Sequence, residues 1–331
     1  VRVFLDVDNL EEGAGAEYID RSECVLAFCT RKYFNSRACA RELMRAVLQG
    51  KPIIAVLEPE QNDEKGGLTV AECKAFLLDA SYTSCKPPAD QSTPPKDRNW
   101  CSRWELDGEV KKWGIDWGRG ENLATPTPQE VAEAVFGEQP LEWSRFTAFQ
   151  DVTMRLIAER VLPHDHVQGG HPPVYVQGEV SQRRVKLPPL APGRTSHLYC
   201  SPYLPPARAL GDELQRLVSG LVLTESIDEL DQCEHMLLYL TSETWTRGEA
   251  SARFAHEVCE AQRKGVHLLL AHEFPSVLED ERTARHACNF NDFWSDGWTP
   301  RWLLAGDSNV YKQIAIALKP DAWRTAGLVK L

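Results

Sequence analysis

Short apolar runs that alternate with amphipathic segments most strongly constrain how this chain folds. In the first half, "ECVLAFCT" (23–30) and "PIIAVLE" (52–58) flank a segment, 36–49, whose apolar residues recur at helical spacing. In the second half, "HMLLYLT" (235–241) and "VHLLLAHE" (266–273) flank a similar segment, 252–265. Continuous apolar runs of this length are typical of strands covered on both faces. The alternation therefore predicts parallel sheets with helices on both sides, a three-layer α/β architecture.

Other segments extend the pattern. We predict strands at 1–7, 196–201 and 220–224, an isolated strand at 173–180, and helices at 16–22, 68–80, 127–136, 146–162 and 207–219. Thr127, Pro128 and Glu130 form a capping box that begins one helix, and Pro163 ends the next. The segment "IAIALKP" (314–320) is predicted to end a helix that closes the second half, as 146–162 closes the first.

The two halves share a spacing of charged and glycine residues. Glu42 lies 50 − 42 = 8 positions before Gly50, and Glu257 lies 265 − 257 = 8 positions before Gly265. This equality predicts an internal duplication. We therefore divide the chain into a first domain at 1–162 with a loop-rich insert at 81–125, a linker at 163–194 and a second domain at 195–331.

Composition excludes several function classes. The net charge is −11, which disfavours binding through nucleic-acid phosphates. The 10 cysteines form no CxxC pair and no zinc-like spacing, and His164, His166 and His171 lie among prolines and glycines, so we predict no metal. Cysteines inside apolar runs favour a reducing, cytoplasmic compartment. The sequence begins with Val1 and has no membrane-spanning run, so a membrane would be reached only through parent sequence that is not present here.

Two segments of the first half carry a resemblance to a known family. They are 18–47, "YIDRSECVLAFCTRKYFNSRACARELMRAV", and 3–13, "VFLDVDNLEEG". The first resembles the core of a TIR domain, and the second resembles that family's second strand and the loop that follows. The second half, about 195–320, is similar but weaker. The resemblance implies two flavodoxin-like domains with parallel sheets. The first would lack its first strand and helix, because "VRVFLDV" matches the family's second strand.

The resemblance also implies two kinds of function. Some TIR domains associate with themselves or with other TIR domains to pass a signal, and the loop with Asn9, Leu10, Gly13 and Gly15 would supply that contact. Others cleave NAD at its glycosidic bond with a glutamate on the third helix. We expect an intracellular signalling module as the leading function and NAD glycohydrolase activity as the alternative.

If the chain is an enzyme, the matching catalytic residue is Glu42 in "CAREL", with Glu257 as its second-domain counterpart. A carboxylate beside the ribose would stabilise the oxocarbenium-like state formed when nicotinamide leaves. Asp6, Asp8 and Cys39 are the candidate substrate-binding residues. Plant members carry tryptophan four positions before this glutamate, where the present chain has Ala38. No cofactor is expected, and NAD would enter only as a substrate.

Overall fold

A computed structural model describes residues 15–61, 64–78, 126–162, 174, 176, 186–277, 284–295 and 297–331. The chain divides into two compact units, residues 1–174 and 175–331, and each unit is considered by itself. The unit boundary falls inside the predicted linker at 163–194. The predicted strand at 1–7, the insert at 81–125 and most of the predicted strand at 173–180 lie outside the described residues.

Unit 1 contains a three-stranded parallel sheet in the order β1-β2-β3. Its strands are β1 (Val25–Cys29), β2 (Ile53–Leu57) and β3 (Leu141–Glu142). Its described helices are α2 (Gly15–Arg21), α3 (Arg31–Phe34), α4 (Arg37–Leu48), α5 (Val70–Leu78), α8 (Pro128–Phe136) and α9 (Thr147–Val161). The predicted strands at 23–30 and 52–58 are thus found with slightly narrower bounds, and Thr127 forms the predicted capping box of α8.

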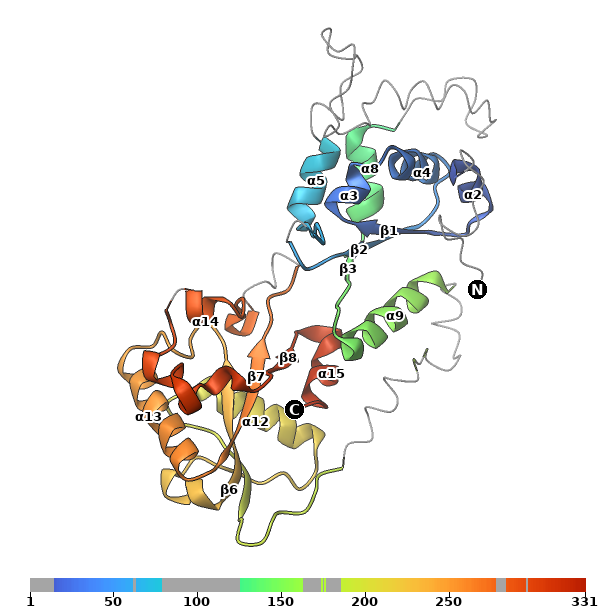
Figure 1. The fold of residues 1–331 in the computed structure, drawn as a ribbon. Coiled ribbons are helices and arrows are strands. Elements are labelled where there is room, and N and C mark those ends of the chain that lie inside the picture. Colours follow the sequence, from blue (N-terminus) through green and yellow to red (C-terminus); the bar gives the residue numbers. More distant parts are fainter. Residues whose placement is uncertain are drawn as a thin grey trace, which may run out of the picture. The chain divides into compact units, whose positions relative to one another are not determined.

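Helices cover unit 1 from both sides. Figure 1 shows α9 on one side of the strands and α3, α4 and α8 on the other. Ile54 and Val56 of β2 pack against apolar side chains of α9, because alternate residues of a strand point to the same face. Arg45 of α4, which is buried, donates to the carboxylate of Asp20 and so ties α2 to α4.

Unit 2 contains a five-stranded parallel sheet in the order β5-β4-β6-β7-β8. Its strands are β4 (Ser196–Tyr199), β5 (Leu223–Thr224), β6 (Cys233–Leu240), β7 (His267–Glu273) and β8 (Ile316–Leu318). Its described α-helices are α12 (Pro205–Leu217), α13 (Glu249–Arg263), α14 (Asp292–Ser295) and α15 (Arg324–Leu328). Short 3-10 turns include Ile227–Gln232, which leads into β6.

Two helices of unit 2 cover opposite faces of this sheet. Gly211 of α12 packs so closely on Cys200, directly after β4, that an added Cβ would lie 3.0 Å from its sulfur. The neighbouring residue Tyr199 points to the other face, where Glu257 of α13 lies beside it. A large apolar core is formed by residues of the strands, α12 and α13, including Tyr199 and Phe254. Mixed α/β architecture with helices on both faces is therefore confirmed.

One prediction about the end of unit 2 was wrong, and two elements in its middle have bounds that differ from the predicted ones. The segment "IAIALKP" contains strand β8, which pairs with β7, and no helix. A strand of three residues is too short to show a period-two pattern. The apolar residues at 314–318 could therefore not be distinguished from the end of a helix. The predicted strand at 220–224 shrinks to β5, and α13 begins three residues earlier than predicted, after Gly248, whose φ is 60°.

The strand–helix–strand unit has the same register in both halves. Cys29 pairs with Leu57, and Leu240 pairs with His272, so Glu58 and Glu273 each come directly after the paired positions. Both helices end alike. Gly50 and Gly265 take positive φ values of 61° and 69°, and each follows a helix whose last turn it closes by hydrogen bonds to carbonyls three residues back. The equal spacing in the sequence therefore corresponds to equal geometry.

Candidate functional site

Glu42 lies on α4 and is partly buried. The helix begins at Arg37 because Ser36 caps it, accepting the amide N–H of Cys39 at 3.3 Å. Cys39 is also partly buried. Of the other predicted residues, Asp6, Asp8, Asn9, Leu10 and Gly13 lie outside the described residues, as does the side chain of Ala38, whereas Gly15 is the first residue of α2. The described residues of unit 1 therefore bring none of the other predicted substrate-binding residues except Cys39 onto the same helix as Glu42.

Glu257 occupies the matching place on α13, and there the structure does assemble a polar site. Its side chain faces the carboxyl end of β4, beside Tyr199 and Ser201, and only 8% of the residue is exposed. Burial raises the pKa of the Glu257 carboxyl, and the hydroxyls of Ser201 and Tyr199 offset part of that effect. Even so, Oε2 of Glu257 and the hydroxyl of Tyr199 have no hydrogen-bond partner of good geometry.

Further residues at the edge of the Glu257 site contact one another and fix its geometry. Ser201 accepts the amide N–H of Tyr203 at 3.1 Å, so its hydroxyl is fixed at the turn after β4. Arg253, one turn before Glu257, lies 5.5 Å from the centre of the Tyr203 ring and pairs with Glu249. Four positions before the glutamate, this half therefore presents a guanidinium.

The sequence did not single out Tyr199, Ser201 or Tyr203. Their position in "SHLYCSPY" (196–203) was the available signal, because polar side chains just after a buried parallel strand lie at the edge where ligands bind. The partnership with Glu257 is not visible in the sequence, since 58 positions separate that residue from Tyr199.

Chemically, the Glu257 site is closed and favours the neutral carboxyl. A raised pKa opposes the ionised form that would stabilise a cationic ribose. An exposure of 8% leaves little room for a nucleotide in the present conformation. The Glu257 carboxyl is therefore a buried polar group with one unsatisfied oxygen, and in this conformation it does not line an open catalytic cleft.

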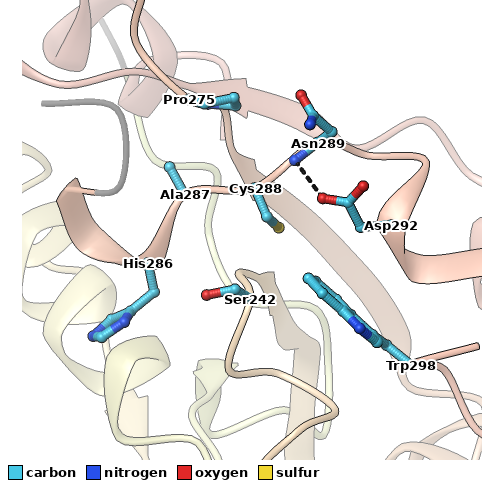
Figure 2. A pocket seen from close by; sticks show the side chains of 8 residues that line it. All are labelled: Ser242, Pro275, His286, Ala287, Cys288, Asn289, Asp292 and Trp298. Atoms are coloured by element: carbon cyan, nitrogen blue, oxygen red, sulfur yellow. Dashed lines mark hydrogen bonds between the residues drawn. The ribbon is translucent and has the colours of Figure 1, made fainter. Parts of the chain in front are cut away.

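A pocket of about 470 Å³ lies elsewhere in unit 2, next to the carboxyl ends of β6 and β7 (Figure 2). Ser242 and Pro275 follow these strands, and the remaining lining residues are His286, Ala287, Cys288, Asn289, Asp292 and Trp298. Burial raises the pKa of the Cys288 thiol to about 12, so the thiolate that nucleophilic chemistry requires is scarce. One Asp292 oxygen accepts the amide N–H of Asn289 at 3.0 Å. Among the described lining residues, the Cys288 thiol is therefore not an activated nucleophile.

Each half also carries a buried glutamate at the carboxyl end of a strand, and this glutamate binds an arginine. Glu58 accepts from Arg145, which follows β3, and Glu273 accepts from Arg324, which begins α15 after β8. Arg324 also pairs with Glu213 of α12 at 2.7 Å, and Tyr239 donates to Glu273 at 2.5 Å. These residues are bound to one another, so we assign them to the stability of the units rather than to a site.

Among the described residues, no group of three or more His, Cys, Asp and Glu side chains converges as a metal site would. The described helices also include none that is both long and apolar enough to cross a bilayer. Comparison with protein-family models, with curated proteins and with solved structures returns no match for this chain.

Proposed function

We propose that this chain is a signalling module of the TIR type that acts by associating with itself or with other TIR domains. In the second sheet, the strands numbered in chain order run 2-1-3-4-5, which is the flavodoxin-like order. The matching register around Glu42 and Glu257 supports two copies of one such fold, with the described strands of unit 1 corresponding to the third, fourth and fifth. The TIR-like core at 18–47 supplies the link to association.

The observation that carries association is an exposed apolar pair on β1, at the edge of the described sheet. Leu26 is 50% exposed and Phe28 36%. Both lie on the face that α9 covers, because they are register partners of Ile54 and Val56, but α9 packs over β2 and β3 instead. Exposed apolar side chains on an edge strand favour pairing with another chain.

Association is tested by light scattering on the full chain. We expect the wild type to form an oligomer. The double substitution Leu26→Lys with Phe28→Lys should disrupt it, because two charges on an edge strand oppose pairing.

The double substitution Leu10→Asp with Gly13→Asp tests the predicted interaction loop. Contacts through this loop should be weak and should depend on both halves or on a high local concentration. Ile314→Lys is the matched control, since Ile314 is exposed in unit 2 and should tolerate the change. A wild-type monomer, or an oligomer that survives both pairs of substitutions, would contradict the proposal.

A second candidate function is cleavage of NAD. The observation that favours it is Glu257 beside two hydroxyls at the carboxyl end of β4, with one carboxyl oxygen without a partner. Glu42 has the matching position in the first half, and in the TIR family this position carries catalysis. For Glu257 to act, the site would have to open and the carboxyl ionise, which its raised pKa opposes at low pH.

Nicotinamide release from NAD tests the second candidate. If unit 1 carries activity, Glu42→Ala should abolish it while changing the free energy of unfolding by about 0.5 kcal/mol or less, because partly exposed helix positions tolerate substitution. Loss of activity only in Glu257→Ala would instead place the site in unit 2. Each variant is compared with Glu260→Ala, an exposed-face carboxylate of α13 that pairs with Arg263. Release that continues in both variants would assign catalysis to neither glutamate.

A further inference from the structure

His235 and His267 lie side by side on neighbouring strands of unit 2. They are register partners in the β6–β7 pair, so both side chains project from the same face of the sheet. Their Nδ1 atoms are 3.0 Å apart, and the ring planes meet at 84° with centroids 5.1 Å apart. Two ring nitrogens thus face each other. In the absence of a cation, the N–H of one ring donates a hydrogen bond to the ring nitrogen of the other.

The separation of the two nitrogens is close to that of two ligands on one metal ion. Zinc–imidazole bonds are about 2.0–2.1 Å long, so two nitrogens at a tetrahedral ion lie about 3.3 Å apart. In a square-planar arrangement, the neighbouring nitrogens are about 2.9 Å apart at similar bond lengths. The observed 3.0 Å falls between these values, so the two nitrogens are already spaced for one ion, and each ring has to turn its lone pair toward it.

The pair is accessible and separate from the site already described. His267 is exposed and His235 is half-buried. Both belong to the amino-terminal parts of their strands, whereas Glu257 and the pocket in Figure 2 adjoin the carboxyl ends of strands. An ion bound here would therefore leave the Glu257 site and the pocket of unit 2 untouched.

The chemistry of the pair also suits ligation. A neutral imidazole offers the lone pair that a transition metal needs. When an ion binds, the ring that donates through Nδ1 moves its proton to Nε2 by exchange with water, so both Nδ1 atoms become ligands without a net release of protons.

We propose that His235 and His267 form a two-imidazole site for a divalent transition-metal ion such as Cu²⁺, Ni²⁺ or Zn²⁺. No third His, Cys, Asp or Glu side chain of the described residues joins them, so water would occupy the remaining coordination positions. The ion would link β6 to β7 near the start of both strands. The sequence concealed this site, because the two histidines are 267 − 235 = 32 positions apart and only the strand register brings them together.

The test is Cu²⁺ titration of the full chain by calorimetry, because copper binds such ligands more tightly than the other first-row divalent ions. His164, His166 and His171 are first replaced by glutamine, which removes a competing group of histidines. We expect the remaining protein to bind one equivalent of Cu²⁺ and to unfold at a higher temperature when the ion is present. Adding either His235→Gln or His267→Gln should weaken this binding at least tenfold.

His256→Gln serves as the matched control, since His256 is an exposed histidine of α13 in the same unit. This substitution should leave the titration unchanged. Circular dichroism without metal confirms that each variant is folded, and His267→Gln, at the first residue of β7, covers the case in which His235→Gln fails to fold. Absence of binding once the linker histidines are gone would overturn the proposal. So would binding that persists in both His235→Gln and His267→Gln.

Discussion

Replacing Arg324 with methionine is expected to lower the free energy of unfolding of unit 2 by about 3–5 kcal/mol, because breaking a buried ion pair leaves an uncompensated charge. The Arg324 side chain is 10% exposed, and its partner Glu273 is fully buried. The guanidinium donates to Glu273 at 2.6 Å and to Glu213 at 2.7 Å, and so joins α15 to β7 and α12. Methionine preserves much of the apolar contact but satisfies neither carboxylate.

Urea unfolding of the wild type and variant measures this effect. Arg263→Met is the control, since that guanidinium is 70% exposed and pairs only across one turn of α13 with Glu260. Exposed pairs of this kind are worth about 0–1 kcal/mol. A loss below about 1 kcal/mol for Arg324→Met would contradict the prediction and show that Glu273 does not depend on Arg324.

The same network predicts how unit 2 responds to acid. Burial alone would raise the pKa of Glu213, but hydrogen bonds and charge from Arg324 and Arg285 lower it overall. A carboxyl with a lowered folded-state pKa contributes stability above its unfolded value of about 4.3, and loses it as the pH falls through the folded value. Arg324→Met should therefore make the stability of unit 2 less dependent on pH in that acidic window.

The sequence was most informative where strands are long and buried. The runs 52–58 and 235–241 were predicted correctly as strands because apolar residues fill both faces. The predicted helical segment 36–49 ends just before Gly50, where the chain takes a positive φ that glycine adopts without strain. These features are local, so a single segment suffices to reveal them.

It was least informative where topology decides the outcome. The two residues of β3 and the three of β8 are strands because β2 and β7 offer them hydrogen bonds, and no local preference marks them. The site residues show the same limit. Glu257 was found from its spacing to Gly265, but its contacts with Tyr199 and Ser201 depend on β4 lying beside β6, which no local pattern states.

Glu257→Met is expected to stabilise unit 2 at neutral pH by about 1–3 kcal/mol, the cost of leaving a buried polar group unsatisfied. The carboxyl lies among core residues of α13, including Phe254 and Val258, and its Oε2 has no partner. Methionine has a similar length and carries no such requirement. A substitution that raises stability at a polar, buried position is characteristic of a residue retained for function rather than for folding.

The pH dependence separates the charge from the shape of this side chain. Burial raises the folded-state pKa of Glu257, so the folded form holds its proton more tightly than the unfolded form does. The associated stability is complete below the unfolded value of about 4.3 and is lost as the pH rises through the folded value. Urea unfolding is measured at pH values from the unfolded pKa up to the folded pKa of Glu257. The free energy of unfolding of the wild type should fall over this range, and it should fall less in Glu257→Gln and Glu257→Met.

Comparison of the two variants identifies the cause of the cost. Glutamine keeps the shape of the side chain without its charge. A stability gain in both variants therefore assigns the cost to ionisation, whereas a gain in Glu257→Met alone assigns it to the unsatisfied polar group. Destabilisation by both would contradict the prediction and make Glu257 a structural partner of Ser201 and Tyr199.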